Sequence, residues 1–372
     1  MANKAFGIIT SAANYIHVEG MHDYRPIGAF SFVGRYRVVD FPLSNMSNSG
    51  IDRIQVYINS RPRSIIDHIG SGRHYNVNSK RGRIQLLFTE SNTPGGLYDT
   101  DIEAMMENME QIERMTNPYV VIAPSYMVYR EDYSKLLEDH VASGADISLL
   151  YYKHSNAKEE YLNAGTLNLN RQKGVTSITR NLGDAKEKNI FMDTYIMSKE
   201  LLIQLIKEAK AYSSLYTLSQ IVSDKCAELD VRGVQHKGYF AAILSLKDYY
   251  NANRRLLSQK DAEDLFKPNW PIYTRTTDSC PTKYYECSDV RNCLVSNGCL
   301  IEGTVENSVI GRGVRIKKGA VVKNSIILAY TTIGENVHVE NEIVDKWANI
   351  THVKEVVAPE GHPGYVKRND TL

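Results

Sequence analysis

Residues 297–344 read NGCLIEGTVENSVIGRGVRIKKGAVVKNSIILAYTTIGENVHVENEIV, and aliphatic side chains recur in this stretch with a six-residue step. Two such series can be followed, Ile310, Ile316, Val322 and Leu328 in one and Val321, Ile327, Ile333 and Val339 in the other. A six-residue period fits neither an α-helix nor an isolated strand. It is typical of a parallel β-helix, whose short strands bury their core by stacking coil on coil. The sequence therefore predicts a β-helix domain over residues 285–372.

The chain before the repeat alternates between short apolar runs and helical stretches. The apolar runs include 5–9, 54–58 and 119–123, and the helical stretches include 101–114, 133–143 and 199–211. This alternation predicts an α/β domain over residues 1–255, with helices on both faces of a mixed or parallel sheet. Three prolines and few periodic apolar residues occur in residues 256–284, so this stretch is expected to be a linker.

The composition of the chain argues against several classes of protein. The 372 residues carry 44 Lys and Arg against 43 Asp and Glu, a formal net charge of +1, whereas proteins that bind nucleic acid usually have a clear basic excess. The sequence has no signal-peptide core and no apolar window long enough to span a membrane. Five cysteines are too few for a disulfide scaffold. We therefore expect a soluble cytoplasmic protein without nucleic-acid or membrane partners.

A family resemblance rests on the strings GRYRVVDFPLSN at 34–45, NSGI at 48–51 and HIGSG at 68–72, together with the C-terminal repeats. These strings resemble the glucose-1-phosphate adenylyltransferases, nucleotidyltransferases that make ADP-glucose from glucose-1-phosphate and ATP. The order of the modules agrees, so the resemblance covers essentially the whole chain. It implies a Rossmann-like, GT-A-like nucleotidyltransferase domain followed by a left-handed parallel β-helix of hexapeptide repeats, and assembly as a tetramer.

The first departure from the family is in the turn after the first strand. Active members have a Gly-Gly turn that ends in Arg, whose glycines let backbone N–H groups approach the triphosphate. The corresponding residues here are Thr10, Ser11, Ala12, Ala13, Asn14 and Tyr15. Without a glycine, their Cβ atoms are expected to crowd such an approach.

The second departure removes both expected metal ligands. Placement beside the string YREDY at 129–133 puts Tyr126 where the family has the Mg²⁺-binding Asp of a Ser-Gly-Asp-His motif. The second metal-binding Asp of the family corresponds to Ala242. A phenol with a pKa near 10 is a poor Mg²⁺ ligand at neutral pH, and alanine offers no ligand. We therefore expect no metal site, no catalytic residues and no cofactor in this chain.

The substrate side of the site also differs from the family. The Gly-Thr-Ala turn corresponds to Thr100, Asp101 and Ile102, and the Glu-Lys-Pro motif corresponds to Arg180, Asn181 and Leu182. The lysine that would contact the sugar phosphate is therefore Asn181. Asp40 could be a catalytic carboxylate, but we interpret it as a structural ion pair or a cap of the following turn.

A family scaffold without its chemistry resembles the GlgD-type non-catalytic subunits of bacterial glucose-1-phosphate adenylyltransferase. The implied partner is a catalytic sister subunit, which would hold the Mg²⁺, in a hetero-oligomer that is expected to be a tetramer; a homo-oligomer is possible alone. Two alternatives within the family are an active adenylyltransferase and a stand-alone sugar-phosphate sensor. A rival outside it is a hexapeptide-repeat acyltransferase, for which His338 would be the candidate catalytic residue.

Arginines supply a candidate effector site. Arg25, Arg35 and Arg37 lie in the stretch that resembles the family's effector-binding segment, and the placement puts Arg25 and Arg37 where activated members present cations to a sugar phosphate. Arg312 and Arg315 on the first coils of the β-helix could complete this site from the other domain, because arginine binds phosphate bidentately. The alternative is that these residues are solvated surface charges.

Overall fold

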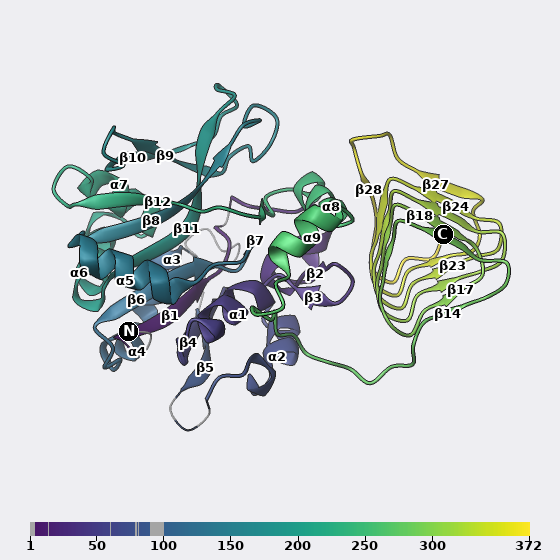
Figure 1. Cartoon of the computed structure of the whole chain (residues 1–372), viewed down its shortest axis with the longest axis horizontal. Helices are drawn as coiled ribbons and strands as arrows, with labels where there is room; N and C mark the ends of the chain where they lie inside the picture. Colours follow the sequence, from purple (N-terminus) through teal and green to yellow (C-terminus); the bar gives the residue numbers. More distant parts are fainter. Residues whose placement is uncertain (1–3, 14, 60, 79, 81, 90–99) are drawn as a thin grey trace.

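The computed structural model describes residues 4–13, 15–59, 61–78, 80, 82–89 and 100–372, so Asn14 of the expected turn lies outside the described residues. Figure 1 shows an α/β domain followed by a parallel β-helix, with α8 and α9 on the side of the α/β domain that faces the β-helix. The predicted fold class is confirmed. No helix in these described ranges is long and apolar enough to cross a membrane.

The α/β domain is built on a mixed sheet whose main path runs β10-β9-β11-β6-β1-β4-β5, with β8 and β12 attached through β11. Its strands are β1 (Ala5–Thr10), β4 (Arg53–Ile58), β5 (Arg83–Phe88), β6 (Tyr119–Pro124), β8 (Ile147–His154), β9 (Gly165–Leu169), β10 (Val175–Arg180), β11 (Lys188–Ser198) and β12 (Val231–Gln235). β1 pairs in parallel with both β4 and β6, and all of its side chains are buried. A central strand covered on both faces needs this continuous apolar run.

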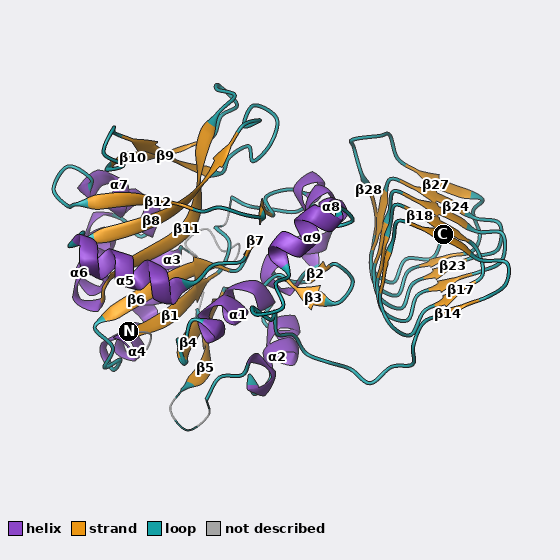
Figure 2. Cartoon of the chain, in the orientation of Figure 1, coloured by secondary structure: helices purple, strands orange, loops and turns teal. Residues whose placement is uncertain are grey.

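Helices and two small strand pairs surround this sheet (Figure 2). The helices are α1 (Asp40–Asn48), α2 (Arg63–Ile69), α3 (Asp101–Glu107), α4 (Met109–Glu113), α5 (Tyr133–Ser143), α6 (Lys199–Tyr212), α7 (Leu218–Lys225), α8 (Leu246–Arg255) and α9 (Gln259–Leu265). The strand pairs are β2 (Ser31–Phe32) with β3 (Tyr36–Arg37), and β7 (Met127–Tyr129) with β13 (Phe240–Ala242).

Two helical details differ from the sequence expectation. The expected helix over 101–114 is divided at Asn108, whose side-chain amide donates to the Ala104 carbonyl and competes with the helical backbone bonds. The stretch 256–284 contains α9 and packs Phe266 against Tyr36, with stacked ring centroids 5.3 Å apart. Aromatic packing therefore holds the first part of this stretch on the α/β domain.

Three parallel sheets form the left-handed β-helix, which Figure 2 shows as strands and loops. The first sheet contains β14 (Lys283–Tyr284), β17 (Leu300–Ile301), β20 (Arg315–Ile316), β23 (Thr332–Ile333) and β26 (Asn349–Ile350). The second contains β15 (Asp289–Arg291), β18 (Thr304–Glu306), β21 (Val321–Lys323), β24 (His338–Glu340) and β27 (Glu355–Val357). The third contains β16 (Leu294–Val295), β19 (Val309–Ile310), β22 (Ile326–Ile327), β25 (Glu342–Val344) and β28 (Gly364–Val366).

The repeat is not uniformly six residues long. Val305 pairs with Val322 and Val322 with Val339, so each of these two coils contains 17 residues and one of its three steps has five residues. The core side chains are therefore Ile310, Ile316, Val322, Ile327, Ile333, Val339, Val344 and Ile350. Leu328 and Val321 were wrong members of the two predicted series. Leu328 packs with the core of the α/β domain instead, and Val321 is half-buried.

The third sheet of the β-helix faces the α/β domain. Alternate side chains of its strands, Val309, Ile326 and Ile343, point away from the β-helix core and join the hydrophobic core of the α/β domain. The Tyr250 hydroxyl of α8 donates to the Asn324 carbonyl across the same junction. Apolar packing and hydrogen bonds therefore join the two domains.

Candidate functional site

A cavity of about 580 Å³ lies where strands of the large sheet end. Thr10, at the end of β1, lines one wall with Ser11, and the Ser11 hydroxyl donates to the Tyr57 carbonyl of β4 at 2.9 Å. Ala12 and Ala13 continue the wall. These two residues of the turn therefore present Cβ atoms, where the family has glycines. Open α/β sheets bind ligands at the carboxyl ends of their strands, which makes this cavity the candidate site.

The two positions expected to have lost metal ligands are neighbours. Tyr126 follows β6, and Ala242 ends β13. Ala242 pairs with Met127, and the Ile243 amide donates to the Tyr126 carbonyl at 2.9 Å. Two sequence placements made 116 residues apart thus meet at one point of the fold, and Asp193, which the Tyr126 hydroxyl contacts, lines the cavity.

A buried carboxylate contacts Tyr126. The Tyr126 hydroxyl donates to Asp193 Oδ2, and Tyr195 donates to the same carboxylate. Burial raises the pKa of Asp193, although both phenol hydrogen bonds oppose this rise. Burial and the adjacent Asp193 raise the pKa of Tyr126 well above its ordinary value, so the phenol keeps its proton. Asp193 has a left-handed backbone with φ 45°, at a register shift of β11 against β8.

These residues do not fit a magnesium ion. Mg²⁺ requires near-octahedral oxygen ligands, usually carboxylates and water. Tyr126 offers a protonated phenol, Ala242 offers no ligand, and Asp193 already accepts from two phenols. Across the ranges that the structure describes, no three His, Cys, Asp or Glu side chains gather as a metal site needs.

The opposite side of the cavity comes from two helix starts. Thr100 caps α3 by accepting from the Glu103 amide, and Asp101 accepts from the Leu218 amide of α7 at 3.1 Å. Burial raises the pKa of Asp101 to about 6. Thr217 and Gln220 form a reciprocal capping box at the start of α7. Both Thr100 and Asp101 line the cavity. The sequence placed these two residues at the substrate turn of the family.

The third substrate motif is split between the cavity and the protein interior. Arg180 lines the cavity, and its guanidinium lies 4.0 Å from the centroid of the Tyr15 ring. Asn181 is fully buried and donates from Nδ2 to the carbonyls of Ala157 and Tyr161. Asn181 thus holds a loop in place and does not line the cavity.

The candidate effector arginines separate into groups. Arg25 is 3% exposed, and its Nη2 donates to Asp345 Oδ1 at 2.6 Å. The Tyr365 hydroxyl donates to the same carboxylate at 2.7 Å. The Arg37 guanidinium donates to the Ala29 carbonyl. Burial, and to a lesser extent the positive charge of the neighbouring Arg25, lowers the pKa of Arg37 to about 10. Arg25 thus already has an anionic partner inside this chain.

Arg35 and Arg312 share a second cavity of about 520 Å³ at the junction of the domains. Arg312 Nη2 donates to the Arg35 carbonyl at 3.3 Å, and Arg312 Nη1 donates to Thr277 Oγ1 at 2.9 Å. Arg315 is exposed on β20 and does not line this cavity. Four of the five expected arginines therefore lie near the junction, in two groups.

Two further residues have structural surroundings. Asp40 is fully buried and contacts His68 Nε2 at 2.6 Å and the Tyr75 hydroxyl, and it also accepts from the Arg37 amide at 2.8 Å. These contacts favour a structural role for Asp40, although its side chain accepts from the preceding Arg37 amide and does not cap the start of α1. His338, the candidate residue of the acyltransferase alternative, lies on the outer side of the β-helix, 3.1 Å from Glu340.

Sequence reasoning missed Asp193 and Asp345. Neither residue lies in a motif, and Asp345 is 320 residues from its partner Arg25. A weak signal for Asp345 was available, since a charged residue follows the apolar run Ile343–Val344 of the repeat. Pairing over such a distance depends on how the two domains meet, which spacing in the sequence does not encode.

Comparison with known proteins identifies the same two domains. The nucleotidyl transferase family matches residues 24–259, and the GlmU-like C-terminal hexapeptide family matches residues 281–359. The chain is 31% identical to the glycogen biosynthesis protein GlgD of Geobacillus stearothermophilus, over 87% of this chain and 84% of that protein. It is 30% identical to the glycogen biosynthesis protein GlgD of Bacillus subtilis, over 97% of this chain and 95% of that protein. It is also 30% identical to the glucose-1-phosphate adenylyltransferase of Clostridioides difficile, over 87% of this chain and 90% of that protein. The chain therefore belongs to the nucleotidyl transferase family, in the group that contains GlgD and the glucose-1-phosphate adenylyltransferases.

Proposed function

We propose that this chain is a regulatory, catalytically deficient subunit that acts in glycogen biosynthesis with a catalytic glucose-1-phosphate adenylyltransferase. The single observation that carries the proposal is the pair Tyr126 and Ala242, which stand side by side where the family resemblance places two metal-binding carboxylates. Transfer of a nucleotidyl group needs metal ions or other cations that neutralise developing charge. The names of the relatives, GlgD and glucose-1-phosphate adenylyltransferase, support the same pathway.

The expected partner is a catalytic sister subunit, which would hold the Mg²⁺, in a hetero-oligomer that we expect to be a tetramer. Homo-oligomers of this chain alone are a further expectation. The cavity between Arg35 and Arg312 offers two cations to a sugar-phosphate effector. Because Arg25 is bound to Asp345, an effector at Arg25 would first have to displace that carboxylate.

The test is a comparison of ADP-glucose formation by three samples: this chain, a catalytic homologue, and their mixture. We expect no product from this chain and an altered rate or effector response in the mixture. A mixture whose activity equals that of the catalytic homologue at every ratio would contradict the regulatory role. Co-purification of the two chains separates a subunit from a stand-alone sensor, since a sensor would not need the partner.

A further inference from the structure

We propose that the cavity at the ends of β1 and β4 binds an uncharged, hydroxyl-rich ligand, a free sugar, and discriminates against phosphorylated sugars and nucleotides. The inference rests on the proposed function, because a chain that catalyses no transfer has no need to hold a triphosphate. It goes further by naming what the cavity of about 580 Å³ accepts instead.

The charge of the lining opposes anions. Among the described residues that line the cavity, three are carboxylates, Asp101, Asp193 and Asp224, one is a cation, Arg180, and none is a lysine or histidine. The Arg180 guanidinium lies over the Tyr15 ring, where the face of an aromatic ring attracts a cation. A phosphate in this cavity would meet an excess of negative charge in a partly desolvated space, where like charges repel strongly.

The helix starts that could have bound phosphate are already capped. Helix N-termini bind anions through backbone N–H groups that have no partner within the helix. At α3, Asp101 accepts from the Ile102 amide and Thr100 accepts from the Glu103 amide. At α7, Asp101 also accepts from the Leu218 amide, and the capping box occupies the amides of Thr217 and Gln220. These amides are therefore used within the chain, two of them by a carboxylate.

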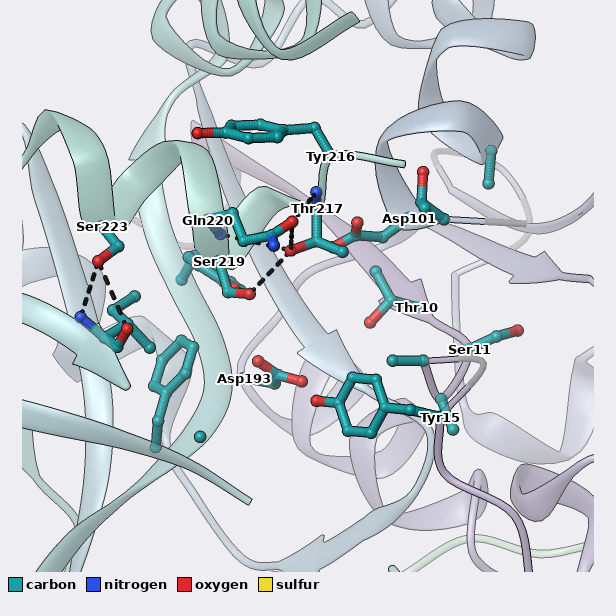
Figure 3. Close-up of a pocket in the computed structure, with 18 of the residues that line it drawn as sticks. Thr10, Ser11, Tyr15, Asp101, Asp193, Tyr216, Thr217, Ser219, Gln220 and Ser223 are labelled. Carbon is teal, nitrogen blue, oxygen red and sulfur yellow. Dashed lines mark hydrogen bonds between the residues drawn. The ribbon is translucent and has the colours of Figure 1, made fainter. Parts of the chain in front are cut away.

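The remaining lining suits a sugar. Hydroxyl groups of Thr10, Thr179 and Ser219 line the cavity, and Tyr216 and Phe191 add aromatic surface. Figure 3 shows Thr10, Ser219 and Tyr216 around one space, with the Tyr15 hydroxyl directed toward the Asp193 carboxylate. Sugars present hydroxyl donors, which carboxylate oxygens accept, and apolar ring faces, which pack on aromatic side chains.

Calorimetric titration of the full chain tests the proposal with four probes: D-glucose, maltose, glucose-1-phosphate and Mg²⁺-ATP. We expect millimolar or tighter binding of at least one uncharged sugar, and at least about tenfold weaker binding of glucose-1-phosphate and ATP. Equal or tighter binding of either phosphorylated probe would overturn the proposal. The absence of binding by both uncharged sugars would overturn it as well.

Two variants locate the site and test the charge argument. Ser219→Trp fills the cavity and should abolish sugar binding, whereas Ser71→Trp, at an exposed position outside the lining, should leave it unchanged. Asp224→Lys at the cavity rim should raise affinity for glucose-1-phosphate about fivefold or more, whereas Asp139→Lys on α5, with the same change of net charge, should not. Sugar binding unaffected by Ser219→Trp, or equal effects of the two lysine variants, would contradict the proposal.

These titrations need no partner subunit. Failure of the mixed assay with sugar binding intact would therefore refute the regulatory role alone. If the titrations detect no sugar binding but the mixed assay gives the expected result, only the proposed ligand of the cavity is refuted.

Discussion

The Tyr126 hydroxyl donates a hydrogen bond to the buried Asp193 carboxylate, at the position where the family resemblance places a metal-binding aspartate. Burial and Asp193 raise the pKa of Tyr126 well above its ordinary value, so the hydroxyl keeps the proton that it donates. The position of the expected metal ligand is therefore filled by a buried phenol that is part of the packed structure.

Removal of this hydrogen bond should reduce stability. Tyr126→Phe keeps the ring but leaves Asp193 with only Tyr195 of its two phenol donors. Loss of a hydrogen bond to a buried polar group costs about 1–3 kcal/mol in the free energy of unfolding. Urea unfolding measures the change, and Tyr212→Phe, at a mostly exposed ring, is the matched control with an expected change below about 0.5 kcal/mol. Equal midpoints for both variants would show that the Tyr126–Asp193 contact contributes nothing.

The Arg25–Asp345 ion pair should join the two domains. Arg25→Ala leaves the fully buried Asp345 carboxylate without its guanidinium partner, which typically costs about 3–5 kcal/mol. The matched control is Arg63→Ala, which breaks an exposed pair with Asp67 and should cost less than about 1 kcal/mol. Thermal unfolding of the variants measures the difference. If Arg25→Ala unfolds at the temperature of the parent chain, the pair has no role in holding the domains together.

Stability should fall with rising pH because of Glu342. Burial raises the pKa of Glu342 from 4.5 to about 7. Between these values the folded chain binds more protons than the unfolded chain, so the free energy of unfolding decreases as pH rises, and this contribution levels off once the pH is well above the folded-state pKa. Glu342→Gln should flatten this slope, whereas Glu335→Gln, at an exposed position, should not. Denaturant unfolding at several pH values provides the measurement, and identical slopes for the parent chain and Glu342→Gln would contradict the assignment.

The register of the β-helix can be tested with two aliphatic residues. Ile327 is fully buried in the β-helix core, whereas Val321, six residues earlier, is half-buried. Ile327→Ala should destabilise by about 2–5 kcal/mol, as expected for a large-to-small change in a packed core. Val321→Ala should cost clearly less, although a uniform six-residue repeat would treat the two positions alike. Equal losses in denaturant unfolding would favour the uniform repeat.

Much of the fold could be predicted because its signals are local. The six-residue period identified the β-helix, and the five-residue step between Val322 and Ile327 explains why Leu328 was misplaced. The motif placements brought Tyr126 and Ala242 to adjacent backbone positions. Asp193 could not be predicted, because its role follows from a left-handed backbone at a strand irregularity. The ionic partner of Arg25 depends on the junction of the domains, which no local pattern describes.

Turnover by the isolated chain tests the central claim most directly. The measurement is ADP-glucose formation from ATP and glucose-1-phosphate with saturating Mg²⁺, by the chain purified without any catalytic homologue. The account predicts no product above background, because Tyr126 and Ala242 supply no metal ligand. A kcat within the usual range for enzymes, roughly 1–10³ s⁻¹, would contradict it.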